Sequence, residues 1–299
     1  MASGEDESED VVSVASVASA DGTVIGYRSQ GVGPGVLVLH GGMESSSDYD
    51  DLARALAAGG FAVHRPDRRG RGLSGPHGSS YALATEVADV RALLRATGAR
   101  HVFGVSSGGL IALRSGLEVE GVATVAAYEP ALDLRTDRTR SDAFVHRYED
   151  AVERGEVAEA LVAMLKGMQV GPRWLRLLPR PAAVALMRRF IASEADSPPD
   201  EVTFSSLVPT MRYDFQVSDE GSAAMARFAE LHHPTLLLGG TKSPGYLRNA
   251  LITLAGLLPQ GHQVTLRGAS HTASSNRAEG GRPDLVAREL LRFWSRAAP

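Results

Sequence analysis

The sequence predicts an α/β fold: a doubly wound, mostly parallel sheet with a helical cap inserted between two of its strands. Short apolar segments that end in glycine alternate with amphipathic helical segments, first up to about residue 130 and again after residue 232. Between these regions the pattern changes to long, arginine-bearing helical segments broken by Gly-Pro and Pro-Pro. The chain has 299 residues, which is enough for one large domain with such an insertion.

The predicted elements of the first half follow in order. Residues 1–10 are acidic with nothing to bury, and we expect a disordered tail. Residues 11–19 and 23–29 flank a turn and predict a β-hairpin. The strands predicted after it are residues 35–42, 61–67, 101–106 and 122–130, and the helices are residues 51–60, 81–98 and 108–116.

Residues 134–231 are expected to form the cap, with helices over residues 142–168 and 174–193. The sheet pattern then returns, so that the predicted core combines residues 11–133 with residues 232–299. An insertion at this point would cover the carboxyl ends of the strands, where open α/β sheets bind ligands. The last predicted strands are residues 234–240 and 262–268, and the last predicted helices are residues 248–258 and 283–294.

Composition excludes several classes of function. There is no cysteine, which excludes disulfides, thiolate metal sites and cysteine nucleophiles, and a net charge of −4 gives no reason to expect nucleic acid. No apolar run approaches the roughly 18 residues of a membrane span, and the acidic N-terminus does not match an export signal. We therefore expect a cytoplasmic protein that acts on a small molecule, free or attached to a carrier, without metal, cofactor or membrane partner. The sequence does not indicate an oligomeric state.

Ser106 is the candidate nucleophile. It is the central residue of Gly104-Val105-Ser106-Ser107-Gly108, a G-x-S-x-G match that lies between a predicted strand and a predicted helix. This is the context of a nucleophile elbow, a strained turn that exposes the serine hydroxyl. Ser107 would contribute mainly its backbone N–H. Small residues are common in a chain with 32 glycines, so the flanking elements carry the interpretation.

His271 is the candidate base among nine histidines. It follows the last predicted strand, and a parallel sheet would bring it to the same rim as Ser106. His40 is expected to support the glycine turn after its own strand. His232 and His233 are neighbours on a strand, so their side chains point to opposite faces and cannot bind one metal together. The other five histidines are expected to be structural or surface residues.

The glycine turn after the strand at residues 35–42 supplies candidate donors for an oxyanion. Backbone N–H groups of Gly42 or Met43, together with that of Ser107, could form an oxyanion hole. Glycines also end strands for steric reasons alone, so this assignment depends on the position of Ser106.

The order of these motifs resembles the α/β-hydrolase superfamily: LVLHGG, RPDRRGRGLSG, FGVSSGG, a helical insertion, PTLLLGG and RGASH. The resemblance covers about residues 20–297. It implies the α/β-hydrolase fold, with a mostly parallel sheet of about eight strands, a helical cap and a catalytic triad of serine, acid and histidine, with Ser106 and His271 in the matching positions.

The acid departs from the family pattern. Members of the superfamily most often carry it in the loop after the strand at residues 234–240, and that loop contains no carboxylate here. Some relatives place it after the preceding sheet strand, where this chain has Glu129. Glu129 is therefore the predicted acid and Asp133 the alternative, while Asp67 is expected to brace the loop after its strand. Glu129 could also cap its strand or pair with an arginine of the cap.

The cap carries clues to the substrate. It is rich in leucine, methionine and phenylalanine and contains Trp174, which favours an apolar or bulky substrate. Tyr213 and Asp214 lie near the end of the insertion and could face the active site, but packing or a surface position is the favoured role. Five arginines could attract an anionic group, although such side chains usually face solvent: Arg173, Arg176, Arg180, Arg188 and Arg189.

The leading hypothesis is a serine hydrolase that cleaves an ester, lactone or thioester of a small, largely apolar molecule through an acyl-serine intermediate. A second hypothesis keeps the fold but uses His271 as the base for C–C cleavage, elimination or cyclisation. A third is a catalytically silent binding protein. Retention of Ser106, His271 and the glycine turn argues against the third, because a binding protein needs none of them.

Overall fold

The computed structural model describes residues 11–134, 139–171, 173–198 and 201–297. The predicted disordered tail, residues 1–10, lies outside this part of the chain. Within it, an eight-stranded sheet has the order β1-β2-β4-β3-β5-β6-β7-β8. The strands are β1 (Ser13–Ala18), β2 (Val24–Gln30), β3 (Gly35–Leu39), β4 (Ala62–Pro66), β5 (His101–Val105), β6 (Thr124–Tyr128), β7 (Thr235–Gly240) and β8 (Gly261–Leu266).

The sheet confirms the predicted fold class. Strands β4, β3, β5, β6, β7 and β8 run parallel to one another. Strand β2 pairs antiparallel with β1, as the predicted hairpin requires, and also with β4. Strands β3, β5, β6 and β7 are almost continuously apolar and buried, which is typical of parallel strands covered on both faces.

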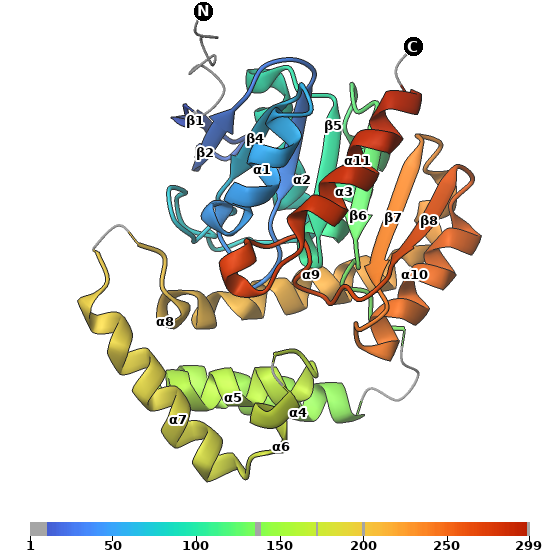
Figure 1. Cartoon of the computed structure of the whole chain (residues 1–299). Helices are drawn as coiled ribbons and strands as arrows, with labels where there is room; N and C mark the ends of the chain where they lie inside the picture. Colours follow the sequence, from blue (N-terminus) through green and yellow to red (C-terminus); the bar gives the residue numbers. More distant parts are fainter. Residues whose placement is uncertain (1–10, 135–138, 172, 199–200, 298–299) are drawn as a thin grey trace, which may run out of the picture.

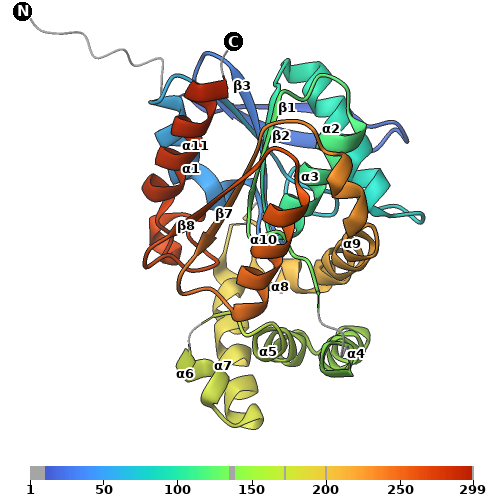
Figure 2. The ribbon, with the colours of Figure 1, turned by 90° about the vertical axis from the view of Figure 1, so that its right-hand side faces the viewer.

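Helices cover both faces of the sheet (Figure 2). On one face α1 (Asp50–Ala57) packs against α11 (Pro283–Ala297), and their apolar residues form a core with Tyr128 and Trp294. On the other face lie α2 (Leu83–Thr97), α3 (Ser107–Glu118) and α10 (Gly245–Leu257), packed around Leu110 and Leu237. The two apolar layers hold the strands in register and fix where each strand ends.

The chain between β6 and β7 forms helices, which Figure 1 shows beyond the carboxyl ends of the strands. We call this segment the cap. Helix α9 lies against the core, where it contacts α3 and α2, and α5 packs against α4 and α7. The helices are α4 (Thr139–Glu153), α5 (Val157–Gly167), α6 (Arg173–Leu177), α7 (Arg180–Ser193), α8 (Phe204–Leu207) and α9 (Met211–Ala223), with short 3₁₀ turns between and after them.

Candidate active site

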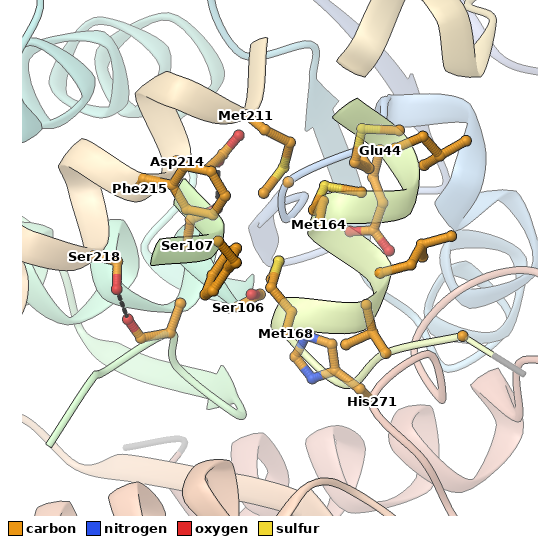
Figure 3. A pocket seen from close by; sticks show the side chains of 18 of the residues that line it. Glu44, Ser106, Ser107, Met164, Met168, Met211, Asp214, Phe215, Ser218 and His271 are labelled. Atoms are coloured by element: carbon orange, nitrogen blue, oxygen red, sulfur yellow. Dashed lines mark hydrogen bonds between the residues drawn. The ribbon is translucent and has the colours of Figure 1, made fainter. Parts of the chain in front are cut away.

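Ser106 lies in a strained turn between β5 and α3. Its φ of 54° and ψ of −119° fall outside the common regions for a residue with a side chain, and such strain gathers at functional sites. The turn is held by main-chain hydrogen bonds, because Ser106 N–H donates to Tyr128 O and its carbonyl accepts from Gly109 and Ala131. The side chain faces a cavity beneath the cap (Figure 3).

The two glycines of the motif are sterically required. A Cβ at Gly104 would lie 2.0 Å from the carbonyl oxygen of Gly108, and a Cβ at Gly108 would lie 2.4 Å from the carbonyl oxygens of Leu39 and His40. No side chain fits at such distances, so β5, α3 and the end of β3 can approach this closely only with glycine. This close packing fixes the backbone of the turn and therefore the direction in which the Ser106 side chain points.

His271 and Glu129 come together although 142 positions separate them. His271 Nδ1 lies 2.7 Å from Glu129 Oε2, and Gly240 N–H donates to Glu129 Oε1 at 2.7 Å. Glu129 is fully buried at the end of β6 with a positive φ of 44°. Tyr128, its neighbour, donates from its hydroxyl to Ser270 O at 2.6 Å, which ties the loop of His271 to β6. His271 lines the same cavity as Ser106, with its second ring nitrogen, Nε2, available to a group bound there.

Asp133, the alternative acid, lines the same cavity. Its backbone N–H donates to Ser222 Oγ at 3.0 Å, which connects it to cap helix α9, while Glu129 makes the contact with His271 Nδ1. Asp67 has the bracing position expected of it. Its carboxylate is fully buried and accepts from the N–H groups of Ser46 and Leu73.

Candidate oxyanion donors lie beside Ser106. Gly42 and Ser107 line the cavity, and so does Met43, which adopts a positive φ of 60°. In the described part of the chain, no acceptor takes the backbone N–H of Gly42, Met43 or Ser107. His40 supports the turn as expected, since its Nδ1 lies 2.8 Å from Gly41 O and its Nε2 accepts from Arg68 N–H. Burial, together with the charges of Arg71 and Arg68, holds the pKa of His40 well below its usual range.

The cavity has a volume of about 710 Å³ and lies between the cap and the carboxyl ends of the strands. Five of the seven methionines of the chain line it, together with several aromatic side chains. No lysine or arginine is among its described lining residues, so the cap arginines Arg176, Arg180, Arg188 and Arg189 do not supply an anion site in it. Its apolar lining includes Met43, Met164, Met168, Met187, Met211, Leu161, Phe144, Phe190, Phe204 and Phe215.

Asp214 takes the less favoured of its two expected roles and lines the active-site cavity. Its side chain is 4% exposed, lines the cavity and accepts hydrogen bonds from Arg68, Arg71 and the hydroxyl of Ser107. Burial opposes ionisation, but Arg71 and Arg68 outweigh it and hold the pKa of Asp214 below its usual range. Tyr213 does pack as expected, stacked on the ring of His77. The arginines of RRGR, residues 68–71, follow a buried strand, and buried arginines need carboxylate partners. That pattern was the sequence signal for a buried acidic residue such as Asp214.

Sequence reasoning also missed Glu44. It lies in the turn after β3 and accepts from Gly41 N–H at 2.8 Å, from the Tyr49 hydroxyl at 2.6 Å and from Ser275 Oγ at 3.1 Å. These contacts join the glycine turn to the loop that carries His271. Burial and the charge of Asp48 raise the pKa of Glu44. No local pattern marks such a residue, because its partners come from distant segments.

Two further carboxyl groups, those of Asp48 and Glu279, line the cavity near Glu44. Burial and the charges of Asp48 and Glu44 raise the pKa of Glu279 from 4.5 to about 8. Because the folded pKa lies above the unfolded value, the native state loses stability as the pH rises from 4.5 through about 8. Glu279→Gln removes this loss, so its melting temperature should match the wild type near pH 4.5 and exceed it increasingly toward pH 8.

Thermal unfolding followed by circular dichroism at pH 4.5, 6, 7 and 8.5 measures this difference. The exposed Glu120→Gln serves as the control, with a difference from the wild type that stays constant over the series. A Glu279→Gln difference that does not grow with pH would contradict the assignment.

Among the described residues, no group of three or more histidine, aspartate or glutamate side chains is arranged to hold a metal ion. A search of the same residues finds no helix with the length and apolar character needed to cross a membrane.

The chain is similar to known proteins in both sequence and fold. A sequence model described as the alpha/beta hydrolase family matches residues 36–289. The crystal structure of an alpha/beta hydrolase from Sphaerobacter thermophilus is similar over 94% of this chain and 100% of that chain, with a TM-score of 0.75 and 30% identity.

Two curated proteins are similar over shorter stretches. A non-heme haloperoxidase from Rhodococcus erythropolis is 36% identical over 95 residues, and a non-heme chloroperoxidase from Streptomyces lividans is 35% identical over 101 residues. These matches cover 31% and 32% of this chain, and 35% and 37% of the two proteins, so the chain spans about a third of the curated relatives it matches.

Proposed function

Because the chain belongs to the α/β hydrolase family, we propose that it is a serine hydrolase that cleaves an ester, lactone or thioester of a largely apolar small molecule through an acyl-serine intermediate. The observation that carries the proposal is the contact of 2.7 Å between His271 Nδ1 and the buried carboxylate of Glu129, beside a cavity that Ser106 shares. A histidine held in this way presents Nε2 as a base.

In the proposed reaction, Ser106 Oγ attacks the carbonyl carbon of the substrate while its proton moves to His271 Nε2. The carbonyl π electrons move to oxygen, and the resulting oxyanion accepts from the N–H of Ser107 and from that of Gly42 or Met43. The intermediate collapses as the bond to the leaving alcohol or thiol breaks, and His271 returns the proton to that group. Water then attacks the acyl carbon while His271 takes its proton. The bond from that carbon to Ser106 Oγ breaks, His271 returns the proton to Oγ, and the acid leaves.

Glu129 supports this scheme through charge and orientation. Its carboxylate accepts from Nδ1–H and so holds the single ring proton of the neutral histidine on Nδ1, which leaves Nε2 with a lone pair. During attack, the same carboxylate stabilises the imidazolium. Gly240 N–H occupies the second carboxylate oxygen and so fixes the plane of the carboxylate. The positive φ of Glu129 adds a strained residue at the acid, as at the nucleophile.

The lining of the cavity supports an apolar substrate. Methionine and phenylalanine side chains of the cap surround the space next to Ser106, and each apolar group that leaves water there adds binding free energy. The volume of about 710 Å³ suits a molecule of roughly drug size rather than an acetyl group.

A fluorophosphonate tests the proposal directly. The purified protein is incubated with the reagent, and its intact mass and labelled peptide are recorded. We expect one addition per chain, at Ser106, as the Ser106 Oγ–P bond forms and fluoride leaves, and none in Ser106→Ala. A panel of p-nitrophenyl esters should then show a higher kcat/KM for octanoate than for acetate. A wild-type protein with native circular dichroism and no label would contradict the proposal.

A further inference from the structure

The cap reaches the candidate oxyanion hole through helix α9, which brings the buried carboxylate of Asp214 and the side chain of Met211 next to it. Asp214, on cap helix α9, accepts from Ser107 Oγ at 2.6 Å. Ser107 directly follows the candidate nucleophile and supplies one of the proposed oxyanion donors. Figure 3 shows Asp214 above Ser107 at the cavity wall. The position of the Ser107 backbone is therefore tied to a residue of the inserted segment.

Asp214 also lies against the other donor segment. A Cβ at Gly42 would come within 2.6 Å of Met211 Sδ, 3.1 Å of Asp214 Cγ and 3.2 Å of Asp214 Oδ2, so the glycine turn lies against the side chains of both residues of α9. If the Asp214 carboxylate moved toward the turn, it would displace Gly42. If it moved away, it would leave Gly42 without this neighbour. Both donor segments thus contact the same carboxyl group.

Arg68 links these pieces. Its Nη1 lies 2.8 Å from Asp214 Oδ1, 3.0 Å from Ser107 Oγ and 3.4 Å from His40 O, at the start of the glycine turn. Its Nη2 donates to Glu86 at 2.8 Å, and Arg71 donates to the second oxygen of Asp214. All four charged side chains are at most 4% exposed.

The buried charges restrict how far these side chains can move apart. Arg68 and Arg71 balance Asp214 and Glu86, and buried charges tolerate little separation from their partners. Without the Asp214 carboxylate, both guanidinium groups would keep a buried positive charge with one partner fewer, and Arg71 Nη1 already lacks an acceptor among the described residues. The guanidinium groups would move toward other acceptors, and Ser107 and His40 would follow Arg68.

We infer that Asp214 is a positioning residue of the oxyanion hole, through which the seated cap holds Ser107 and the glycine turn at the spacing that an oxyanion needs. The inference rests on the proposed serine hydrolase function and adds a role for the cap in transition-state stabilisation. Asp214 acts through the Ser107 hydroxyl and Arg68, and it does not contact the reacting atoms.

Two variants test the inference. Asp214→Asn keeps the shape and removes the charge, while Ser107→Ala keeps the backbone N–H and removes only the hydroxyl that Asp214 holds. Each is measured for kcat and KM with p-nitrophenyl octanoate. Each is also measured for affinity toward an apolar trifluoromethyl ketone, which forms a hemiketal oxyanion on Ser106, and toward the matching methyl ketone, which binds as a ground-state analogue.

We expect kcat to fall about 100-fold in Asp214→Asn and about 10-fold in Ser107→Ala, since removing a whole oxyanion donor costs about 10²- to 10³-fold. KM and the affinity for the methyl ketone should stay within about twofold, while the affinity for the trifluoromethyl ketone falls in parallel with kcat/KM. That parallel is the signature of a lost transition-state interaction, which a merely structural role would not produce.

Asp89→Asn is the matched control. Asp89 is a buried aspartate, 6% exposed at its side chain, that pairs with Arg69 on the far side of the loop and contacts neither Ser107 nor Gly42. Its melting temperature should fall, but its kcat and its ratio of ketone affinities should remain those of the wild type.

The measurements separate failure of the positioning role of Asp214 from failure of the proposed hydrolase function. Equal losses of affinity for both ketones, or unchanged kcat in both variants, would overturn the positioning role while leaving a wild type that is labelled at Ser106. A wild type that neither hydrolyses the ester nor reacts with a fluorophosphonate would overturn the proposed function and this inference together. Should Asp214→Asn fail to fold, Ser107→Ala decides alone.

Discussion

Ser106→Ala and His271→Ala are each expected to lower kcat for p-nitrophenyl octanoate by about 10⁵- to 10⁶-fold. The hydroxyl that would form the acyl-enzyme is lost in the first variant, and the base that accepts its proton is lost in the second. KM should change little, because the apolar cavity that holds the substrate is untouched in both. Steady-state kinetics, with single-turnover experiments at high enzyme concentration, measures the residual rate.

The double variant sharpens this test. If the two side chains act as one unit, Ser106→Ala combined with His271→Ala should lose no more activity than either single variant. Additive losses would mean that the two residues contribute independently, which contradicts attack by a serine activated by this histidine. Ser218→Ala, which changes another hydroxyl that lines the cavity, is the control and should keep most of the wild-type rate.

Glu129→Gln is expected to lower kcat by about 10⁴-fold while the fold stays intact. The amide has the shape of the carboxylate, and its oxygen would take the hydrogen bond that Gly240 N–H now gives to Oε1. The amide nitrogen would then face His271 Nδ1 and force that nitrogen to accept. The ring proton would move to Nε2, so the histidine would present N–H where it needs a lone pair. Unchanged activity in this variant would exclude Glu129 as the acid.

Asp133→Asn separates the two candidate acids. It should reduce kcat by less than about threefold, because His271 Nδ1 contacts the carboxylate of Glu129, and the backbone N–H of Asp133 donates to Ser222 in the cap. A loss of about 10⁴-fold in Asp133→Asn with little loss in Glu129→Gln would assign the role to Asp133.

A relocated acid offers a rescue experiment. Ser243, in the loop after β7, is 5% exposed, and its hydroxyl has no hydrogen-bond partner among the described residues. It lies next to Gly240, which contacts Glu129. Ser243→Asp in the Glu129→Gln background should recover at least tenfold in kcat, and Ser243→Asn should recover none.

The core of the fold could be predicted because its pattern is local. Buried parallel strands such as β5 and β7 are short apolar runs that end in glycine, and each lies next to an amphipathic helix, so a single pass along the chain reveals them. The same logic predicted that Ser106, Glu129 and His271 lie at one rim, since each follows a strand and all parallel strands end there. The preference for Glu129 over Asp133 came from the family resemblance, and in the structure it is Glu129 whose carboxylate lies 2.7 Å from His271 Nδ1.

The polar surroundings of the site could not be predicted, because they depend on contacts between distant segments. Asp214 reaches Ser107 across 107 positions, and Glu44 meets Ser275 across 231. Neither residue has a periodic neighbour that marks it as buried, and isolated acidic residues in helical segments usually face solvent. The chain alone likewise does not tell which faces of α6 and α7 meet the cavity, so the anion site remained an alternative for the cap arginines until the lining of the cavity was seen; Arg176, Arg180, Arg188 and Arg189 are not part of it.

The methionine-rich wall of the cavity has a consequence for the chemical durability of the protein. Thioethers are oxidised to sulfoxides by peroxides, and each sulfoxide replaces an apolar contact with a polar, chiral one. Met164, Met168, Met187 and Met211 line the space beside Ser106, so oxidation there would wet the cavity while the sheet beneath stayed intact. Exposure to peroxide would thus weaken substrate binding in the cavity before the protein unfolds. Methionine sulfoxide reductases would restore the thioethers and with them the apolar lining.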